Sequence, residues 1–333
     1  MKRILGALVL VASFGAPIAQ SSSKEVVVYS ARKEHLVKPL FDAYKKKTGV
    51  NITYITDKAA PLMAKIKGEG KRTKADILFT VDAGNLWEAG NKGLLKKVDS
   101  KVLNANVPSH LRDPNGKWYG LSVRARTIAF STDRVKPSQL KSYEDLAAPK
   151  WKGKLCLRTS KKVYNQSLTA MFMETFGKDR TEAIIRAWVA NLATKVFPND
   201  TSVLKAIAAG QCDVGIVNSY YFARLQNKDP KIKVKLFWPK AKNKGTHVNV
   251  SGAGLVNHGK NPVEAQKFLE WLSGAEAQKI FAELNFEFPV LKSVAPAKLV
   301  AKWGSFDQSL INVSKAGELQ SEAIKLMDRA GYR

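Results

Sequence analysis

Hydrophobic residues follow two alternating spacings along the first third of the chain. Short runs of β-branched residues predict strands, and apolar residues three or four positions apart predict helices. Strands are expected over 25–30, 50–54 and 76–80, and helices over 34–47, 61–67 and 86–90. Strands that alternate with helices predict an α/β sandwich with a mainly parallel sheet.

An extended apolar stretch over residues 118–130 leaves this first group of elements and predicts a crossing into a second lobe. A similar stretch over 247–256 predicts the return crossing. Further elements are expected as helices over 164–176, 181–192, 203–209, 262–284 and 308–327, and as strands at 155, 195–197 and 213–217. Two α/β lobes joined by two crossing strands predict a clamshell that holds its ligand in the cleft.

These patterns also divide the chain into parts. We expect a first α/β lobe of residues 24–126 together with 250–275 and a second α/β lobe of residues 127–249. Residues 276–333 are expected to form C-terminal helices that pack on the lobes. Residues 1–20, a charged start followed by a short apolar run, predict a secretory signal peptide cleaved near residue 20.

Two adjacent tyrosines follow the apolar strand that begins near Asp213. Side chains of neighbouring strand residues point to opposite faces, so Tyr220 and Tyr221 can serve one site only if the strand ends before them. Asn218 and Ser219 are suited to begin a helix at this point. The pattern predicts two phenols and a helix N-terminus at the carboxyl end of a strand, where open α/β sheets bind ligands.

The net charge of the chain is large, but it says little about which class of partner the protein binds. The formal net charge is +27, and loss of Lys2 and Arg3 with the signal peptide would leave about +25. Such a charge is typical of nucleic-acid or anionic-surface binding. The lysines are spread along helix-like segments, however, and export removes nucleic acid as a routine partner. We interpret most of them as a solvated surface.

The two cysteines suit an oxidising compartment. Cys156 and Cys212 lie in or beside two apolar strands of the second lobe, and neighbouring strands allow the spacing of a disulfide. We expect them to pair. Two cysteines make a poor zinc site, and the histidines lack metal-ligand spacing. No nucleophile–base motif stands out, so we expect a binding protein rather than an enzyme.

At this point the motifs resemble a known family. An early Tyr-Ser-Ala-Arg at 29–32, the Ala-Asp strand at 75–78, the Phe-Pro-Asn-Asp turn at 197–200 and the double tyrosine are similar to the periplasmic ferric-ion-binding proteins of bacterial iron ABC importers. The resemblance covers essentially the whole chain after the signal peptide. It implies an α/β, two-lobed type II periplasmic-binding-protein clamshell located in the periplasm.

The resemblance also implies a metal site. Its tyrosine-rich subgroup binds Fe(III) through tyrosines of the second lobe, which match Tyr164, Tyr220 and Tyr221 here. Fe(III) is a hard Lewis acid that prefers anionic oxygen, and three phenolates neutralise it. The remaining positions would take water or a synergistic anion such as carbonate. Arginine suits a planar oxyanion, and the matching candidates are Arg32, Arg124 and Arg126.

The first lobe departs from several members of this family. Some place histidine or histidine and tyrosine where this chain has Lys33 and Glu34, and others place glutamate where it has Val81 and Asp82. The usual protein ligands of this lobe are therefore missing. We expect the first lobe to contribute mainly an arginine-held anion, while the tyrosines bind metal even in the open clamshell.

The resemblance implies an inner-membrane ABC permease and its ATPase as partners, and we expect a monomer that does not bind nucleic acid. The alternative is a protein of the same fold that binds a small anionic solute without metal. In that case the arginines would be the primary contacts, and the tyrosines would stack on the solute or hydrogen-bond to it.

Overall fold

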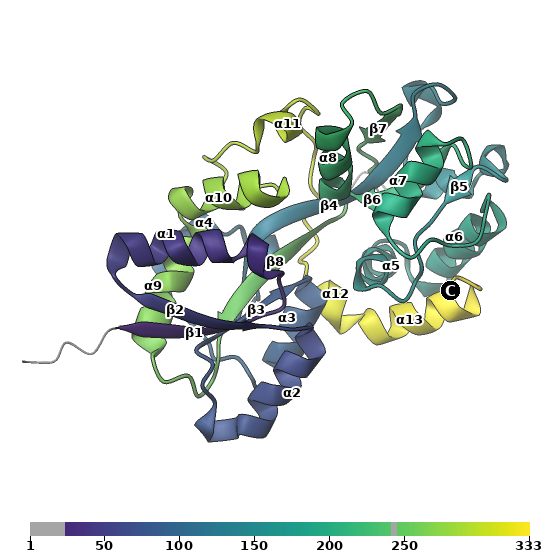
Figure 1. Cartoon of the computed structure of the whole chain (residues 1–333). Helices are drawn as coiled ribbons and strands as arrows, with labels where there is room; N and C mark the ends of the chain where they lie inside the picture. Colours follow the sequence, from purple (N-terminus) through teal and green to yellow (C-terminus); the bar gives the residue numbers. More distant parts are fainter. Residues whose placement is uncertain (1–23, 241–244) are drawn as a thin grey trace, which may run out of the picture.

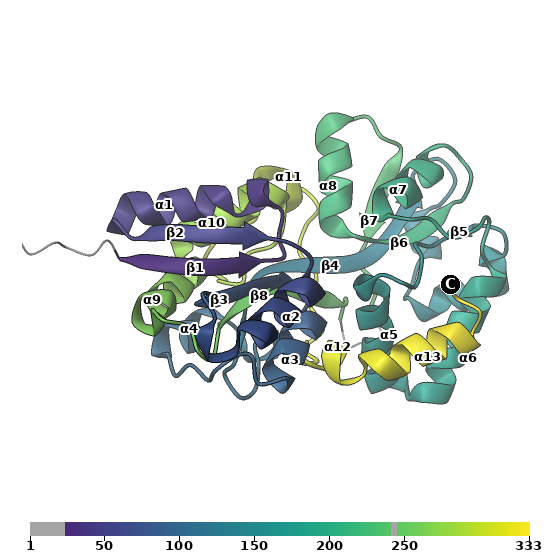
Figure 2. The ribbon, with the colours of Figure 1, turned by 60° about the horizontal axis from the view of Figure 1, so that its bottom comes forward.

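The computed structural model describes residues 24–240 and 245–333, so the predicted signal peptide lies outside the described residues. Figure 1 shows two lobes with a long strand, β4, running from one into the other. Figure 2, turned by 60°, shows the same arrangement. The predicted two-lobed α/β clamshell is confirmed. Within the described ranges, every helix is too short or too polar to span a bilayer.

One sheet runs through both lobes, in the order β2-β1-β3-β8-β4-β6-β5, with β7 also paired to β4. Its strands are β1 (Glu25–Ser30), β2 (Asn51–Thr56), β3 (Ile77–Val81), β4 (Tyr119–Ser131), β5 (Leu155–Cys156), β6 (Val214–Asn218), β7 (Val234–Phe237) and β8 (Val248–Leu255). The expectation of a mainly parallel sheet is wrong, because four of the seven strand pairs among the described residues are antiparallel. The reason is that β8 returns along β4 and inserts between β3 and β4.

Strand β4 belongs to both lobes. Its first half pairs with β8, and its second half, from Arg126 onward, pairs with β6 and β7. All of its residues are buried, which explains why the segment reads as a largely apolar run. Of its polar side chains, Ser122, Arg124, Arg126 and Thr127 have hydrogen-bond partners. The predicted crossing over 118–130 therefore corresponds to β4, and the predicted return strand corresponds to β8.

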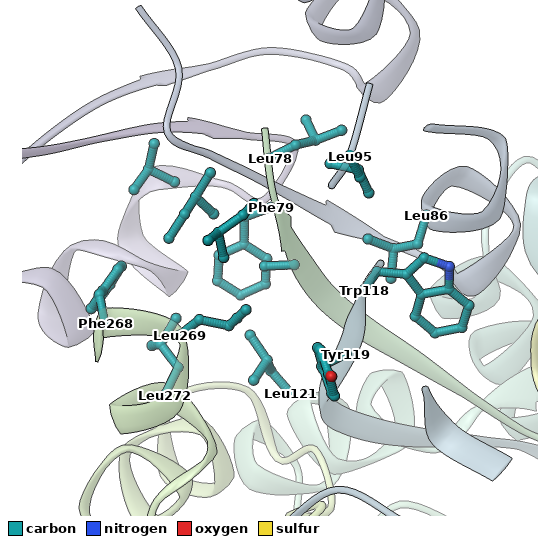
Figure 3. Close-up of a cluster of buried hydrophobic side chains, with 14 of the residues drawn as sticks. Leu78, Phe79, Leu86, Leu95, Trp118, Tyr119, Leu121, Phe268, Leu269 and Leu272 are labelled. Atoms are coloured by element: carbon teal, nitrogen blue, oxygen red, sulfur yellow. The ribbon is translucent and has the colours of Figure 1, made fainter. Parts of the chain in front are cut away.

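Helices cover the first-lobe part of the sheet. They are α1 (Lys38–Thr48), α2 (Ala59–Glu69), α3 (Ala83–Asn91), α4 (Lys101–Asn106), α9 (Pro262–Ser273) and α10 (Ala275–Asn285). Helix α1 buries Leu40, Phe41 and Tyr44 at helical spacing and ends at Gly49, whose φ of +75° suits glycine. Figure 3 shows the core beneath these helices, with Phe79 of β3 and Leu121 of β4 close to Leu269 of α9.

A separate core fills the second lobe. It lies among α5 (Val163–Phe176), α6 (Lys178–Ala190) and the second half of the sheet. The other helices of this region are α7 (Asp200–Ala208), α8 (Ser219–Lys228) and α11 (Lys298–Ala301). Helices α12 (Lys315–Glu318) and α13 (Gln320–Arg329), yellow in Figure 1, run along both lobes, because α12 packs on α3 and α5 and α13 packs on α5 and α6.

Single 3₁₀ turns connect several of these elements: η1 (Glu34–Leu36), η2 (Gly70–Arg72), η3 (Ser109–Leu111), η4 (Pro137–Gln139), η5 (Glu144–Ala147) and η6 (Pro149–Trp151). The predicted helix over 34–47 is therefore η1 followed by α1. Pro39 occupies the first turn of α1, where its missing N–H is not needed.

Three further predicted elements differ from the structure. The helix expected over 262–284 is two helices separated at Gly274, which has extended dihedrals. The helix expected over 308–327 begins later, because residues near Ser309 pair with the backbone of Thr246. The strand expected at 195–197 is reduced to a single bridge between Phe197 and Arg158.

A disulfide joins Cys156 to Cys212, the pair expected from the sequence. Cys156 ends β5 and Cys212 precedes β6, and these two strands are parallel neighbours. Their Cα atoms lie 5.9 Å apart, within the range that a disulfide requires. The bond closes a loop across a sequence separation of 56 residues that includes α5 and α6.

Replacing both cysteines by serine is expected to lower the free energy of unfolding by about 4 kcal/mol, because a loop of this length restricts the unfolded chain. Urea denaturation of the oxidised protein and the double variant measures the difference. A reducing agent should destabilise the parent protein and leave the variant unchanged. Equal stability of the two oxidised proteins would contradict the expectation.

Candidate metal centre

Tyr220 and Tyr221 lie in the first turn of α8, immediately after β6 ends at Asn218. The chain turns at this point as the sequence predicts, and the two rings lie with their centroids 4.4 Å apart. Asn218 occupies the N-cap position, but its side chain makes no capping bond. Its Oδ1 instead accepts a hydrogen bond from Arg126 Nη1 at 3.0 Å. The helix start is thus fixed by the crossing strand.

A buried carboxylate, Asp200, fixes the end of β6. Asp200 follows Asn199, which caps α7 by accepting a hydrogen bond from the backbone of Ser202. Its Oδ2 accepts from the backbone N–H of Asn218 at 2.9 Å and from Arg126 Nη1 at 3.1 Å. Its Oδ1 faces Arg158 Nη1 at 3.5 Å. The turn at 197–200 therefore carries the group that aligns the tyrosine strand.

The third tyrosine approaches from a different helix. Tyr164 lies in the first turn of α5, and Tyr220 Oη donates to Tyr164 Oη at 3.4 Å. The next residue, Asn165, accepts from Arg126 Nε at 2.9 Å. Arg126 therefore contacts the starts of both tyrosine-bearing helices. The three phenols expected from the sequence come together on the second lobe.

A cavity of about 190 Å³ lies between the lobes in front of these phenols. The second lobe contributes the three tyrosines and Arg224, and α10 and the loop after it contribute Asn285 and Glu287. The remaining lining residues, from the first-lobe strands, the loop after β1 and η1, are Ala31, Arg32, Lys33, Leu36, Val81, Arg124 and Ser251. The cavity thus combines phenol oxygens on one side with cationic side chains on several sides.

The three arginines expected to bind an anion occupy different places. Arg32 and Arg124 line the cavity, whereas Arg126 is not among its lining residues. All three are buried and paired with carboxylates: Arg32 with Glu287 at 3.0 Å, Arg124 with Asp82 at 3.3 Å and Arg126 with Asp200 at 3.1 Å. Arg124 and Arg126 share one face of β4 but serve carboxylates on different elements.

Two further arginines flank the phenols and were not predicted. The Cζ atom of Arg158 lies 5.2 Å from the Tyr164 ring centroid, and that of Arg224 lies 5.2 Å from the Tyr220 ring centroid. Arg224 also donates through Nη2 to Asn285 Oδ1, across the cleft. Arg224 follows Tyr220 by one helical turn, and this spacing could have predicted that the two side chains are neighbours. No comparable spacing in the sequence relates Arg158 to the tyrosines.

Among the residues that the structure describes, the first lobe places no histidine or tyrosine in the cavity lining. Lys33 lines the cavity, but Glu34 accepts a hydrogen bond from Tyr54 Oη at 2.7 Å and is not among the lining residues. Glu287 is the only lining carboxylate among the described residues, and its Oε2 accepts bonds from Arg32 and Ser122.

Burial sets the protonation of the phenols in the metal-free site. It raises the pKa of Tyr164, against the opposing effect of Arg124. It raises the pKa of Tyr220 well above that of a free phenol, and the neighbouring Tyr164 and Tyr221 add to this shift. Burial would also raise the pKa of Glu287, but Arg32, Ser122 and Arg124 hold it below its usual range. Tyr164 and Tyr220 are therefore protonated beside the ionised carboxylate of Glu287 when no metal is bound.

This donor set suits one class of metal. Among residues 24–240 and 245–333, no group of three or more histidine, cysteine, aspartate or glutamate side chains is arranged to hold a metal ion. Phenol oxygens that deprotonate on binding favour a hard, highly charged cation.

Comparison with known proteins assigns the chain to a family. Residues 72–307 match the family model of the bacterial extracellular solute-binding proteins. The chain belongs to this family. This solute-binding protein is 39% identical over 326 residues to "Iron uptake protein A1" of Synechocystis sp., a match that covers 96% of this chain and 91% of the relative.

Two solved structures show the same architecture. One, from Trichodesmium, is described as in complex with iron and citrate ligands; it is 43% identical, with a TM-score of 0.89, and covers 93% of this chain and 100% of its own. The other is the ferric iron-binding protein A of Mannheimia haemolytica in an open conformation, 38% identical with a TM-score of 0.87, covering 93% and 99%. The predicted resemblance to ferric-ion-binding proteins is confirmed.

Substituting Asp200 by asparagine is expected to destabilise the protein by about 3–5 kcal/mol, because Arg126 would lose its buried carboxylate partner and Arg158 its nearest one. Asp133→Asn is the control, since Asp133 forms an exposed ion pair with Lys233 and should change stability by less than about 1 kcal/mol. Chemical denaturation measures both. Similar losses in the two variants would contradict the role of Asp200.

Proposed function

We propose that this solute-binding protein captures ferric ion in the periplasm and delivers it to the inner-membrane permease of an ABC importer. The observation that carries the proposal is the convergence of Tyr164, Tyr220 and Tyr221 on one cavity between the lobes. The names of its relatives support it: one is an iron uptake protein, and another, from Serratia marcescens, is an "Fe(3+)-binding periplasmic protein".

The three phenolates would neutralise Fe(III), and the charges around them favour an additional anion. Five arginines lie at or beside the site, but only three carboxylates are paired with them, namely Asp82, Asp200 and Glu287. The surplus among the arginines is two positive charges, and Lys33 in the cavity lining adds a third, so the site favours an additional anion such as carbonate. Arg224, whose contact is an amide rather than a carboxylate, is the arginine best placed to add to the predicted anion-binding set.

A small anionic solute bound without metal is the second candidate, favoured by the same surplus charge. It predicts that citrate or phosphate alone stabilises the protein, by about 2.7 kcal/mol at a concentration one hundred times the Kd. A thermal shift under chelated, iron-free conditions separates the two candidates. Stabilisation by the anion alone supports this alternative, and stabilisation only with Fe(III) present supports iron capture.

Ferric citrate added to the metal-free protein is expected to produce a visible phenolate-to-iron charge-transfer band. The double variant Tyr220→Phe with Tyr221→Phe should lose most of the band and bind iron more than about 100-fold more weakly, because it loses two of the three anionic oxygens and keeps only that of Tyr164. Tyr54→Phe is the matched control, since that first-lobe phenol contacts Glu34 and does not line the cavity. A wild-type protein without the band would refute the proposal.

Iron affinity is expected to fall as the pH falls. The pKa values of Tyr164 and Tyr220 are raised, so both phenols are protonated near neutral pH and each must release a proton to bind metal. Below these pKa values the logarithm of the affinity should therefore rise by at least about 2 per pH unit. A pH-stat titration with ferric citrate, corrected with a protein-free blank, counts the protons. Tyr164→Phe should release about one proton fewer.

A further inference from the structure

Asp82 adopts an unusual backbone conformation where β3 ends. Its φ is +80°, and among the described residues only Phe286 shares a positive φ without being glycine. The residue is fully buried, and its backbone N–H donates to the carbonyl of Val250 on the return strand at 2.9 Å. A side-chain-bearing residue keeps such a conformation only where its surroundings enforce it, and such sites are often functional.

The carboxylate of Asp82 gathers donors from four elements. It accepts from the backbone of Gly84 in α3 at 2.9 Å and from Asn249 Nδ2 in β8 at 2.9 Å. Arg124 Nη2 of β4 donates at 3.3 Å, and Ser167 Oγ of α5 lies 3.1 Å from both carboxylate oxygens. Asp82 therefore joins the two strands β4 and β8 to a helix of each lobe.

Two of these donors, Ser167 and Arg124, are neighbours of Tyr164. Ser167 is three residues after Tyr164 on α5, so the two side chains lie on one face of the helix. The Cζ atom of Arg124 lies 5.1 Å from the Tyr164 ring centroid. A second contact between the lobes, from Arg224 to Asn285, lies on the side of Tyr220 and does not involve the crossing strands. Asp82 is thus connected to one ligand position from both lobes.

We propose that Asp82 is a positioning residue that couples closure of the lobes to the assembly of the tyrosine site. Ser167 Oγ can donate its one proton to Asp82 or to the Val163 carbonyl of its own helix at 2.9 Å. The bond to Asp82 requires α5 of the second lobe to lie this close to the start of α3, so it favours the arrangement of the lobes seen in this structure. The ion pair with Arg124 holds that guanidinium beside Tyr164. The closure part stands independently of the ligand, and the part concerning Tyr164 rests on the proposed function.

Ser167→Ala tests closure, because it removes only the hydroxyl that bridges the lobes. Spin labels on cysteines introduced at Lys205 in α7 and Lys279 in α10, both exposed, report the distance between the lobes. The native cysteines are paired and do not react. Without metal, the variant should shift the population about tenfold toward longer distances. The same measurement with the diamagnetic ion Ga(III) tests the loaded form.

Asp82→Asn tests the second part. Arg124 would lose its carboxylate, so its charge would act more strongly on the Tyr164 phenolate and move the iron charge-transfer band to shorter wavelength. Ser167→Ala keeps the ion pair between Asp82 and Arg124, so it should move the band less than Asp82→Asn does. Asp76→Asn is the control, since this buried aspartate lies at the other end of β3, and its side chain accepts hydrogen bonds from Val27 and Asn261 of the first lobe.

Each outcome decides one part. Unchanged distances in Ser167→Ala, both without metal and with Ga(III), would overturn the closure role. An unmoved band in Asp82→Asn, or an equal shift in Asp76→Asn, would overturn the positioning of Arg124. If the wild-type protein binds neither Fe(III) nor Ga(III), the proposed function fails, and the metal-free distances still decide whether Asp82 holds the lobes together.

Discussion

The tyrosine site depends on the burial of one carboxylate, Asp200. It sits at the start of α7, and its partners come from the end of β6, from β4 and from the segment before α5. Burying a guanidinium without a counter-charge is costly, so Arg126 and Arg158 can pack behind the phenols only because Asp200 is there. The first turns of α5, α7 and α8 are thereby fixed relative to one another. Because the tyrosines lie in the first turns of α5 and α8, their phenol groups are held in fixed relative positions.

The sequence predicts the parts of this site that are local. The apolar strand, the turn at Asn218 and the two tyrosines after it are adjacent in the chain, so periodicity and helix-start residues suffice to place them. The roles of the arginines are not local. Arg32 pairs with Glu287, which lies 255 residues later in the chain, and no spacing in the sequence predicts that pairing. The family resemblance placed Arg32 near the cavity but could not reveal its partner.

Strand directions were mispredicted for a related reason. Alternating strands and helices indicate parallel neighbours within each lobe, and β1, β2 and β3 follow that rule. The crossing strands obey a different constraint, because a chain that leaves through β4 must come back beside it. On β4 itself, Arg124 and Arg126 share one face. Arg124 pairs with Asp82 of the first lobe and Arg126 pairs with Asp200 of the second, so two residues of one strand serve different lobes.

The place of β8 in the sheet has a consequence for the order in which the protein can fold. Its residues, Val248–Leu255, separate β3 from β4, so the first-lobe sheet stays incomplete until three quarters of the chain has been made. The second lobe waits longer still, because part of its core comes from α13 near the carboxyl terminus. A newly synthesised chain of this topology therefore cannot complete either lobe until late in synthesis, and an incompletely folded polypeptide is the form that can be threaded through a narrow translocation channel.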